Sequence, residues 1–156
     1  MRRKSPRSVL IIEARFYEDI ADELARGAVE ELRANHVEFE RIAVPGCLEI
    51  SLALSLALAN GFVGRAARHR GCVALGCVIQ GETSHYDIVA RESAAGLYRL
   101  AVDHAVPVGN GIITCDDPEQ AWARASVDGR NKGGDAARAC LALLMLEQHF
   151  SSASRR

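Results

Sequence analysis

Thr83, Ser84 and His85 stand where an apolar segment gives way to a helical pattern. They belong to the segment GCVIQGETSHYD, residues 76–87, which precedes a helical pattern at residues 86–104. The start of a helix has unpaired backbone N–H groups and partial positive charge, so it suits an anion. His85 can accept and donate a proton near neutral pH. Because open α/β sheets do chemistry at the carboxyl ends of their strands, we predict the active site here.

The apolar periodicity predicts four strands that alternate with helices. Strands are expected at residues 8–14, 37–44, 72–75 and 106–114. Helices are expected at residues 20–32, 47–60, 86–104, 117–125 and 136–150. Such alternation is typical of a parallel sheet with right-handed crossovers and helices on both faces. One α/β domain with three α/β/α layers is therefore predicted.

The composition limits the classes of function that are open. A chain of 156 residues suits one domain around one sizeable core. Its net charge of −1, with 49% hydrophobic and 25% charged residues, gives no argument for nucleic-acid or membrane binding. Residues 1–7 and 151–156 are polar or basic and are expected to be flexible tails of this single 1–156 domain.

The cysteines indicate a reducing compartment. They are odd in number, scattered and without a CxxC pair, which is typical of buried thiols in a cytoplasmic protein. The five are Cys47, Cys72, Cys77, Cys115 and Cys140. A signal peptide is not expected, because the apolar stretch at residues 8–12 is short and is followed by Glu13.

The segment CLEISLALSLALAN, residues 47–60, is apolar almost all the way round its predicted helix. Such a helix must be covered on more than one side, and in a small chain a neighbouring subunit is the favoured cover. A central helix in a monomer is the alternative.

The connection at residues 60–71 contains Arg68, His69 and Arg70, which we expect to be solvated. Gly109 and Gly111 in the fourth strand indicate a close approach of another segment to the backbone.

Several familiar motifs are absent from the sequence. It contains no GxxxxGK[ST], and no GxGxxG follows the first strand, which argues against nucleotide and dinucleotide sites. It also lacks GxSxG, HExxH and paired Cys/His spacings, so no motif supports a hydrolase or a zinc site. Residue patterns alone thus predict an oligomeric α/β protein with an anion-and-proton site near His85.

Four separated motifs together resemble the lumazine synthase family of riboflavin biosynthesis. They are ARFYEDI at 14–20, VPGCLEI at 44–50, GCVIQGETSHYDIVA at 76–90, and VPVGNGIIT with EQAWARA within 106–125. NKG at 131–133 adds a smaller match. The motifs follow the family's order and spacing over most of the chain, and the set is specific although each alone is weak.

The resemblance implies a flavodoxin-like fold and a defined reaction. Family members join 5-amino-6-(ribitylamino)uracil to 3,4-dihydroxy-2-butanone 4-phosphate through an imine, expel phosphate, close the ring and lose water. The product is 6,7-dimethyl-8-ribityllumazine, and neither a metal nor a redox cofactor takes part. The family assembles as pentamers with active sites between subunits, and some pentamers pack into sixty-subunit shells. Residues 126–130 lack the glycine-rich character of many shell-forming members, which favours a free pentamer.

The resemblance also implies roles for residues in the pyrimidine and ribityl sites. Phe16 matches the aromatic residue that stacks on the pyrimidine, a role that suits an aromatic ring just past a strand end. Cys47, Leu48 and Glu49 match the segment that lines the ribityl site, and Cys77, Val78 and Ile79 match the strand end whose backbone bonds the uracil edge. Glu49 would accept hydrogen bonds from hydroxyl groups, and it can also interact with the helix dipole.

A second group of residues matches the phosphate and proton-transfer site. Gly81, Glu82 and Thr83 match the phosphate loop, and His85 matches the general acid/base. Arg124 matches an arginine that reaches the phosphate from the adjacent subunit, and a guanidinium is well suited to that anion. Lys132 is a second candidate near the same site.

The main departure from the family is Asn110, where many members have an aromatic residue contributed to the pyrimidine pocket by the neighbouring subunit. Asparagine could hydrogen-bond there instead of stacking. This favours one alternative, a binding module that holds a flavin or lumazine-like ring without turnover, whereas the intact His85 and Arg124 favour catalysis. A structural shell subunit is a second alternative. A third, flavodoxin-like electron transfer, lacks a phosphate loop after the first strand, where Arg15, Phe16 and Tyr17 stand.

Overall fold

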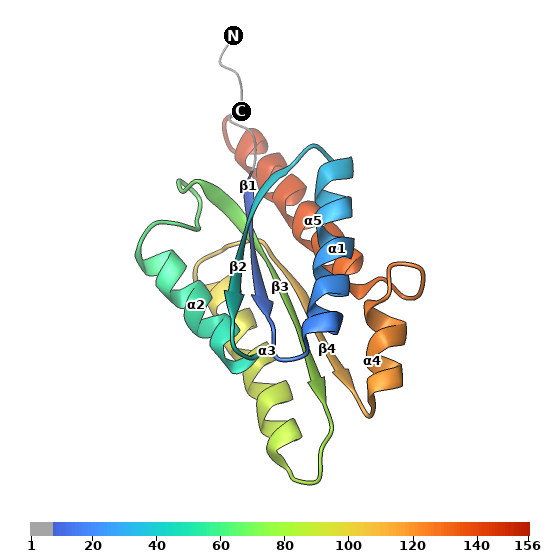
Figure 1. Ribbon diagram of the computed structural model, residues 1–156. Coiled ribbons are helices and arrows are strands. Elements are labelled where there is room, and N and C mark those ends of the chain that lie inside the picture. Colours follow the sequence, from blue (N-terminus) through green and yellow to red (C-terminus); the bar gives the residue numbers. More distant parts are fainter. Residues whose placement is uncertain (1–7) are drawn as a thin grey trace.

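The computed structural model describes residues 8–156 and shows one four-stranded parallel sheet between two layers of helices (Figure 1). The strands are β1 (Ser8–Ala14), β2 (Glu38–Val44), β3 (His69–Ile79) and β4 (Val108–Cys115), in the order β2-β1-β3-β4. The helices are α1 (Glu18–Ala34), α2 (Leu48–Ala59), α3 (His85–Asp103), α4 (Pro118–Ala125) and α5 (Lys132–Ala153). The predicted three-layer fold is confirmed. The N-terminal tail expected at residues 1–7 lies outside the described residues.

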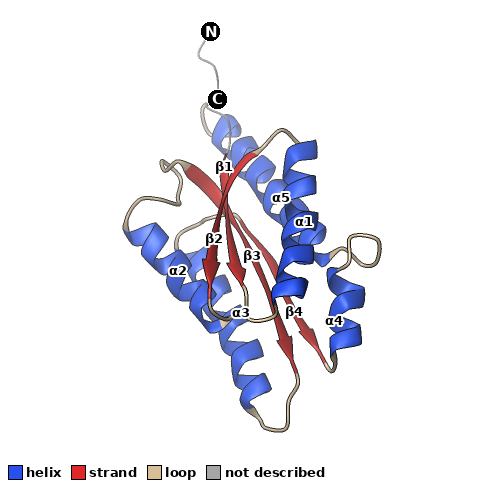
Figure 2. Cartoon of the chain, in the orientation of Figure 1, coloured by secondary structure: helices blue, strands red, loops and turns tan. Residues whose placement is uncertain are grey.

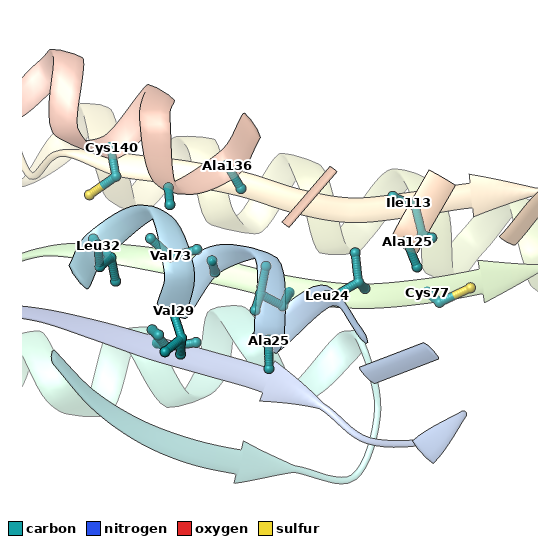
Figure 3. Packing of buried hydrophobic residues seen from close by; sticks show 14 of the residues in the cluster. Leu24, Ala25, Val29, Leu32, Val73, Cys77, Ile113, Ala125, Ala136 and Cys140 are labelled. Atoms are coloured by element: carbon teal, nitrogen blue, oxygen red, sulfur yellow. The ribbon is translucent and has the colours of Figure 1, made fainter. Parts of the chain in front are cut away.

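Each face of the sheet carries its own hydrophobic cluster. Helices α2 and α3 cover one face, and α1, α4 and α5 cover the other (Figure 2). Because strand side chains alternate between faces, Val9 and Ile11 of β1 belong to the α1/α5 cluster, whereas Leu10 and Ile12 belong to the α2/α3 cluster. Leu24 and Leu32 of α1 pack over the first cluster (Figure 3). Because helices cover both faces of the sheet, residues 9–12 of β1 form an unbroken apolar run rather than an alternating pattern.

Strand β3 begins at His69, three residues before the predicted start, and this corrects one interpretation. His69 was expected to be solvated, yet it is fully buried. Its register partner is Ser8, whose Oγ lies 2.8 Å from His69 Nδ1, and Glu40 Oε2 lies 3.1 Å from Nε2. The flanking Arg68 and Arg70 obscured the strand in the sequence. Arg70 is also not simply solvated, because it donates to Glu147 at 2.9 Å.

Helix α5 is longer than predicted at both ends. It begins at Lys132 rather than residue 136, and it extends through Ala153, so residues 151–153 are helical and not part of a tail. Asn131 caps the helix from a left-handed conformation and accepts a hydrogen bond from the Gly134 N–H at 3.2 Å. A Cβ on Gly133 would lie 2.0 Å from the Leu24 carbonyl oxygen. Gly133 therefore permits close packing of α5 on α1, and a Cβ on Gly134 would instead meet the capping Asn131 side chain, although this pair of glycines was interpreted as a helix break.

Helix α2 buries one side and exposes another within this chain. Ile50, Leu54 and Ala57 are buried against the sheet, whereas Leu52 is 63% and Leu56 is 66% exposed. Large exposed leucines on consecutive turns form a continuous apolar stripe. Across the described residues, no helix combines the length and apolar character needed to cross a membrane.

Candidate active site

A cavity of about 350 Å³ lies at the carboxyl ends of β1, β2 and β3. The strands all point towards this end of the sheet, so the loops that follow them meet there (Figure 1). The cavity is lined by residues from the β1–α1 and β2–α2 loops, from the end of β3, and from the first turns of α3. This is the location that the strand-to-helix motif predicted.

The β1–α1 loop supplies an aromatic wall. Phe16 lines the cavity and is 72% exposed, which is unusual for so apolar a ring in a single chain. The Tyr17 ring meets it edge-on, with 4.9 Å between ring centroids and 79° between planes. Burial raises the pKa of the Tyr17 hydroxyl, so that hydroxyl is protonated at neutral pH. The exposed face of Phe16 is available to stack on a flat ring.

The β2–α2 loop and the end of β3 form the floor of the cavity. Cys47, Leu48 and Glu49 line it from the start of α2, and the Cys47 thiol donates to the Cys77 carbonyl oxygen at 3.7 Å. Burial raises the pKa of Cys47 to about 11 and that of Cys77 to about 12. Both thiols are therefore protonated at neutral pH, and they line the cavity rather than act as nucleophiles. Glu49 adds a carboxylate to this largely apolar lining.

The β3 strand end and the start of α3 complete the lining. Val78 and Ile79 lie at the end of β3, and Gly81, Thr83 and His85 follow within seven residues. Residues 81–85 are all exposed, and α3 begins at His85. The His85 N–H donates to Thr83 Oγ1 at 3.3 Å. A hydroxyl, the first amides of a helix and an imidazole thus meet at one side of the cavity, which suits an anion and a proton transfer.

Four predicted site residues do not line this cavity within residues 8–156; they are Glu82, Asn110, Arg124 and Lys132. Glu82 is exposed in the loop before α3. Asn110 Oδ1 accepts the Ile112 N–H at 2.9 Å on the edge strand β4. Arg124 is half-buried on α4 and donates to the Gln120 carbonyl oxygen at 3.2 Å. Lys132 Nζ lies 3.3 Å from Asp135 Oδ2.

Sequence reasoning missed four lining residues, which are Tyr17, Gly46, Tyr86 and Val89. All four fall inside the motifs. Helical spacing could have found Val89, because it stands one turn beyond His85 and faces the same side of α3. Tyr17 had no such signal, since a residue at a helix start can point inwards or outwards.

The comparison with known sequences decides between the families that could use such a cavity. The sequence profile described as 6,7-dimethyl-8-ribityllumazine synthase matches residues 6–148, which is most of the chain. The chain belongs to this family. The resemblance carried by the motifs is thereby confirmed.

Relatives from the lumazine synthase family match nearly end to end. The chain is 52% identical to the 6,7-dimethyl-8-ribityllumazine synthase of Xanthobacter autotrophicus over 145 residues, 92% of this chain and 87% of that protein. It is 49% identical to the enzyme of Afipia carboxidovorans over 143 residues, again 92% and 87%. It is 47% identical to 6,7-dimethyl-8-ribityllumazine synthase 1 of Rhizobium meliloti over 152 residues, 97% and 99%.

Proposed function

We propose that this cavity joins 5-amino-6-(ribitylamino)uracil to 3,4-dihydroxy-2-butanone 4-phosphate. As a member of the lumazine synthase family, the chain is a transferase that forms 6,7-dimethyl-8-ribityllumazine in riboflavin biosynthesis. The observation that carries the site assignment is the meeting of Phe16, Glu49 and the 81–85 loop around one cavity. These groups match a flat ring, a polyol chain and a phosphate, which are the three parts of the combined substrates.

The pyrimidine is bound by stacking and by backbone groups. Phe16 presents an open ring face at the cavity, and the strand end at Cys77, Val78 and Ile79 presents the backbone to the uracil edge. Glu49 accepts hydrogen bonds from the ribityl hydroxyls, beside Cys47 and Leu48. The phosphate of the second substrate is held by Thr83 Oγ1 and the amides that begin α3, with Gly81 and Glu82 in the same loop.

His85 moves the protons. Attack of the pyrimidine's 5-amino group on the ketone gives a carbinolamine, whose loss of water to the imine requires a proton at the leaving hydroxyl. Expulsion of phosphate, ring closure and the final dehydration also require protons to be removed and returned. An imidazole on the first residue of α3, beside the phosphate site, can serve these steps in turn. Alignment of the two substrates in one cavity supplies the rest of the acceleration.

We further propose that the enzyme is a cytoplasmic homopentamer whose sites lie between subunits. Arg124, Lys132 and Asn110 then reach the cavity of the neighbouring subunit, which accounts for their position away from the chain's own cavity. The exposed Leu52 and Leu56 of α2 support such a contact, because association would remove their stripe from water. The guanidinium of Arg124 binds the phosphate and stabilises it as it leaves.

The test follows lumazine absorbance with both substrates for wild type, Arg124→Ala and His85→Ala. We expect product from wild type, a loss of about 100-fold for His85→Ala, and a stronger loss for Arg124→Ala. Arg138→Ala is the control, because Arg138 is an exposed arginine paired with Glu31 and Asp135. Absence of product from wild type, together with tight flavin binding, would instead support the binding module.

Mixed oligomers test the shared site directly. Co-expressed His85→Ala and Arg124→Ala subunits should regain part of the wild-type rate, because some interfaces then combine an intact His85 with an intact Arg124. Homo-oligomers of the two variants should keep their reduced rates when they are mixed without subunit exchange. A co-expressed mixture no faster than the average of its parents would show that the site does not cross the subunit boundary.

A further inference from the structure

Glu13 is a buried carboxylate on β1 that the reaction does not use. It occupies the position after Val9 and Ile11 on the same face of the strand, and both of those residues are fully buried and apolar. Glu13 itself is only 3% exposed. Because an unpaired buried carboxylate is costly, a carboxylate in this place must be held by cations or by several donors.

Two arginines provide that pairing. Arg41 on the edge strand β2 binds Glu13 through two parallel bonds, Nε to Oε2 at 2.8 Å and Nη2 to Oε1 at 2.9 Å. Arg15 Nη1 donates to Glu13 Oε1 at 2.7 Å, and its Nη2 bonds the Asp22 carboxylate on α1. Two carboxylates and two guanidiniums thus form a network of zero net charge across β1, β2 and α1. Such bidentate pairs fix geometry as well as charge.

Arg15 also begins the connection that carries Phe16. This connection contains only residues 15–17, between the end of β1 and the start of α1. Its first N–H, on Arg15, donates to the Val44 carbonyl oxygen at 3.0 Å, and its last carbonyl, on Tyr17, accepts from the Ala21 N–H at 2.9 Å. Phe16 stands between these anchors with 72% of its surface exposed. The position of the Phe16 ring is therefore set mainly by the backbone hydrogen bonds of the connection, and less by side-chain packing.

We propose that Glu13 is a positioning residue for the pyrimidine substrate, acting through Arg15 on the backbone that carries Phe16. The proposal rests on the stacking role of Phe16 in the proposed function. Loss of the negative charge leaves two guanidiniums facing a neutral group, and Arg15 retains only Asp22, whose side chain is 66% exposed. Arg15 then shifts outwards with α1's first turn, and the ring moves off the stacking position.

The central test is Glu13→Gln, which keeps the size of the side chain, removes its charge and replaces one acceptor oxygen by an NH2 donor. The KM for 5-amino-6-(ribitylamino)uracil should rise by about 5–10-fold, a fraction of the roughly 5–150-fold that complete loss of a base–aromatic stack would cause. The KM for the butanone phosphate and kcat should stay within about twofold, because the phosphate loop is not part of this network. Binding of the product lumazine, followed by its fluorescence without turnover, should weaken by the same factor as the pyrimidine.

A double-mutant cycle separates positioning from general destabilisation. In a Phe16→Ala background, Glu13→Gln should change product binding by less than twofold, because the ring it positions is absent. Equal effects of Glu13→Gln with and without Phe16 would overturn the proposal. Wild type that binds product but forms none would contradict the proposed reaction alone, since the binding cycle still reports on Phe16.

Two further variants keep the test decisive if Glu13→Gln does not fold. Arg41→Gln removes two donors but leaves the Arg15 bond to Glu13, so it should raise the pyrimidine KM in the same direction by a smaller factor. The control is Arg138→Gln, which breaks a comparable network with Glu31 and Asp135 about 20 Å along α1 from Phe16. The pyrimidine KM should be unchanged in this control. An equal KM effect from both arginine variants would also overturn the proposal.

Discussion

His69 Nδ1 lies 2.8 Å from Ser8 Oγ, where β1 and β3 begin in the interior. Glu40 Oε2 approaches the other ring nitrogen at 3.1 Å, and the Phe62 ring meets the imidazole edge-on at 4.7 Å between centroids. This pair joins two neighbouring strands at the end of the sheet opposite the cavity. It therefore serves the fold and not the reaction.

Replacement of His69 by leucine should lower the free energy of unfolding by about 1–3 kcal/mol, because it leaves the buried Ser8 hydroxyl without its partner. Urea unfolding at pH 7 measures the loss, with the enzyme concentration held constant. Adding Ser8→Ala to this variant should recover part of the loss, since both polar partners are then gone. The turnover of the folded variant should match wild type. A leucine variant as stable as wild type would contradict this account of the pair.

The fold could be predicted from the sequence because its main signals are local. Apolar runs of strand length alternate with helical patterns, and parallel sheets allow few arrangements of such elements. His69 escaped prediction because a buried histidine between two arginines has the composition of a solvated loop. The start of α5 escaped because Gly133 and Gly134 read as a break. The cause at Gly133, the Leu24 carbonyl oxygen lying where a Cβ would be, is a contact between segments far apart in the chain.

The site was partly predictable for a related physical reason. Residues such as Cys77, Thr83 and His85 stand close together in sequence around one strand end, so a motif places them in one cavity. Asn110 and Arg124 do not line the cavity of their own chain, and no periodicity in the sequence places them there. Their membership in the site remains a prediction, which the mixed-oligomer experiment checks for Arg124 and the variants at position 110 check for Asn110.

Gly109 supplies a prediction about packing. The sequence indicated a close approach to the backbone here, and a Cβ on Gly109 would lie 1.8 Å from the Ala136 carbonyl oxygen on α5. Gly109→Ala should therefore force α5 away from β4 and cost more than about 3 kcal/mol of stability. Gly81→Ala is the control, since a Cβ there would meet nothing within 4 Å. Thermal unfolding of both variants checks this, and equal midpoints would show that α5 adjusts freely.

Cys140 predicts a pH dependence of stability. Its side chain lies among the packed buried residues (Figure 3), and this burial raises its pKa from the ordinary 9.0 to about 12. Above pH 9 the unfolded chain loses this proton while the folded chain keeps it, so the unfolded state binds fewer protons. The free energy of unfolding should then fall by about 1.4 kcal/mol per pH unit for this group, having been at its full value below pH 9.

The variant Cys140→Ala isolates that contribution. It should be less stable than wild type at pH 7, because a buried sulfur is lost, but its stability should fall less steeply between pH 9.5 and 11. Denaturant unfolding across this range measures both slopes. Groups other than Cys140 contribute equally to both profiles and cancel in the difference. Parallel pH profiles would contradict a raised pKa for Cys140.

Asn110 supplies the last prediction, on the strength of pyrimidine binding. Its side chain accepts the Ile112 N–H at 2.9 Å, so its amide oxygen is occupied within its own strand. If β4 of one subunit borders the cavity of the next, an aromatic ring at this position can pack against the bound pyrimidine. Asn110→Phe should then lower the pyrimidine KM by about 2–12-fold relative to Asn110→Ala, the range that 0.5–1.5 kcal/mol for an aromatic pair corresponds to.

The alanine variant is the proper reference because both substitutions remove the hydrogen bond to Ile112 and only one adds a ring. Steady-state kinetics with the butanone phosphate held at saturation measures the pyrimidine KM of each. If the two rings enclose the pyrimidine from opposite sides, one ring alone holds it loosely. The lower KM of Asn110→Phe relative to Asn110→Ala should then disappear when Phe16→Ala is added. A phenylalanine variant with the same KM as the alanine variant would show that position 110 does not face the bound pyrimidine, and that the departure from the family at this residue leaves substrate affinity unchanged.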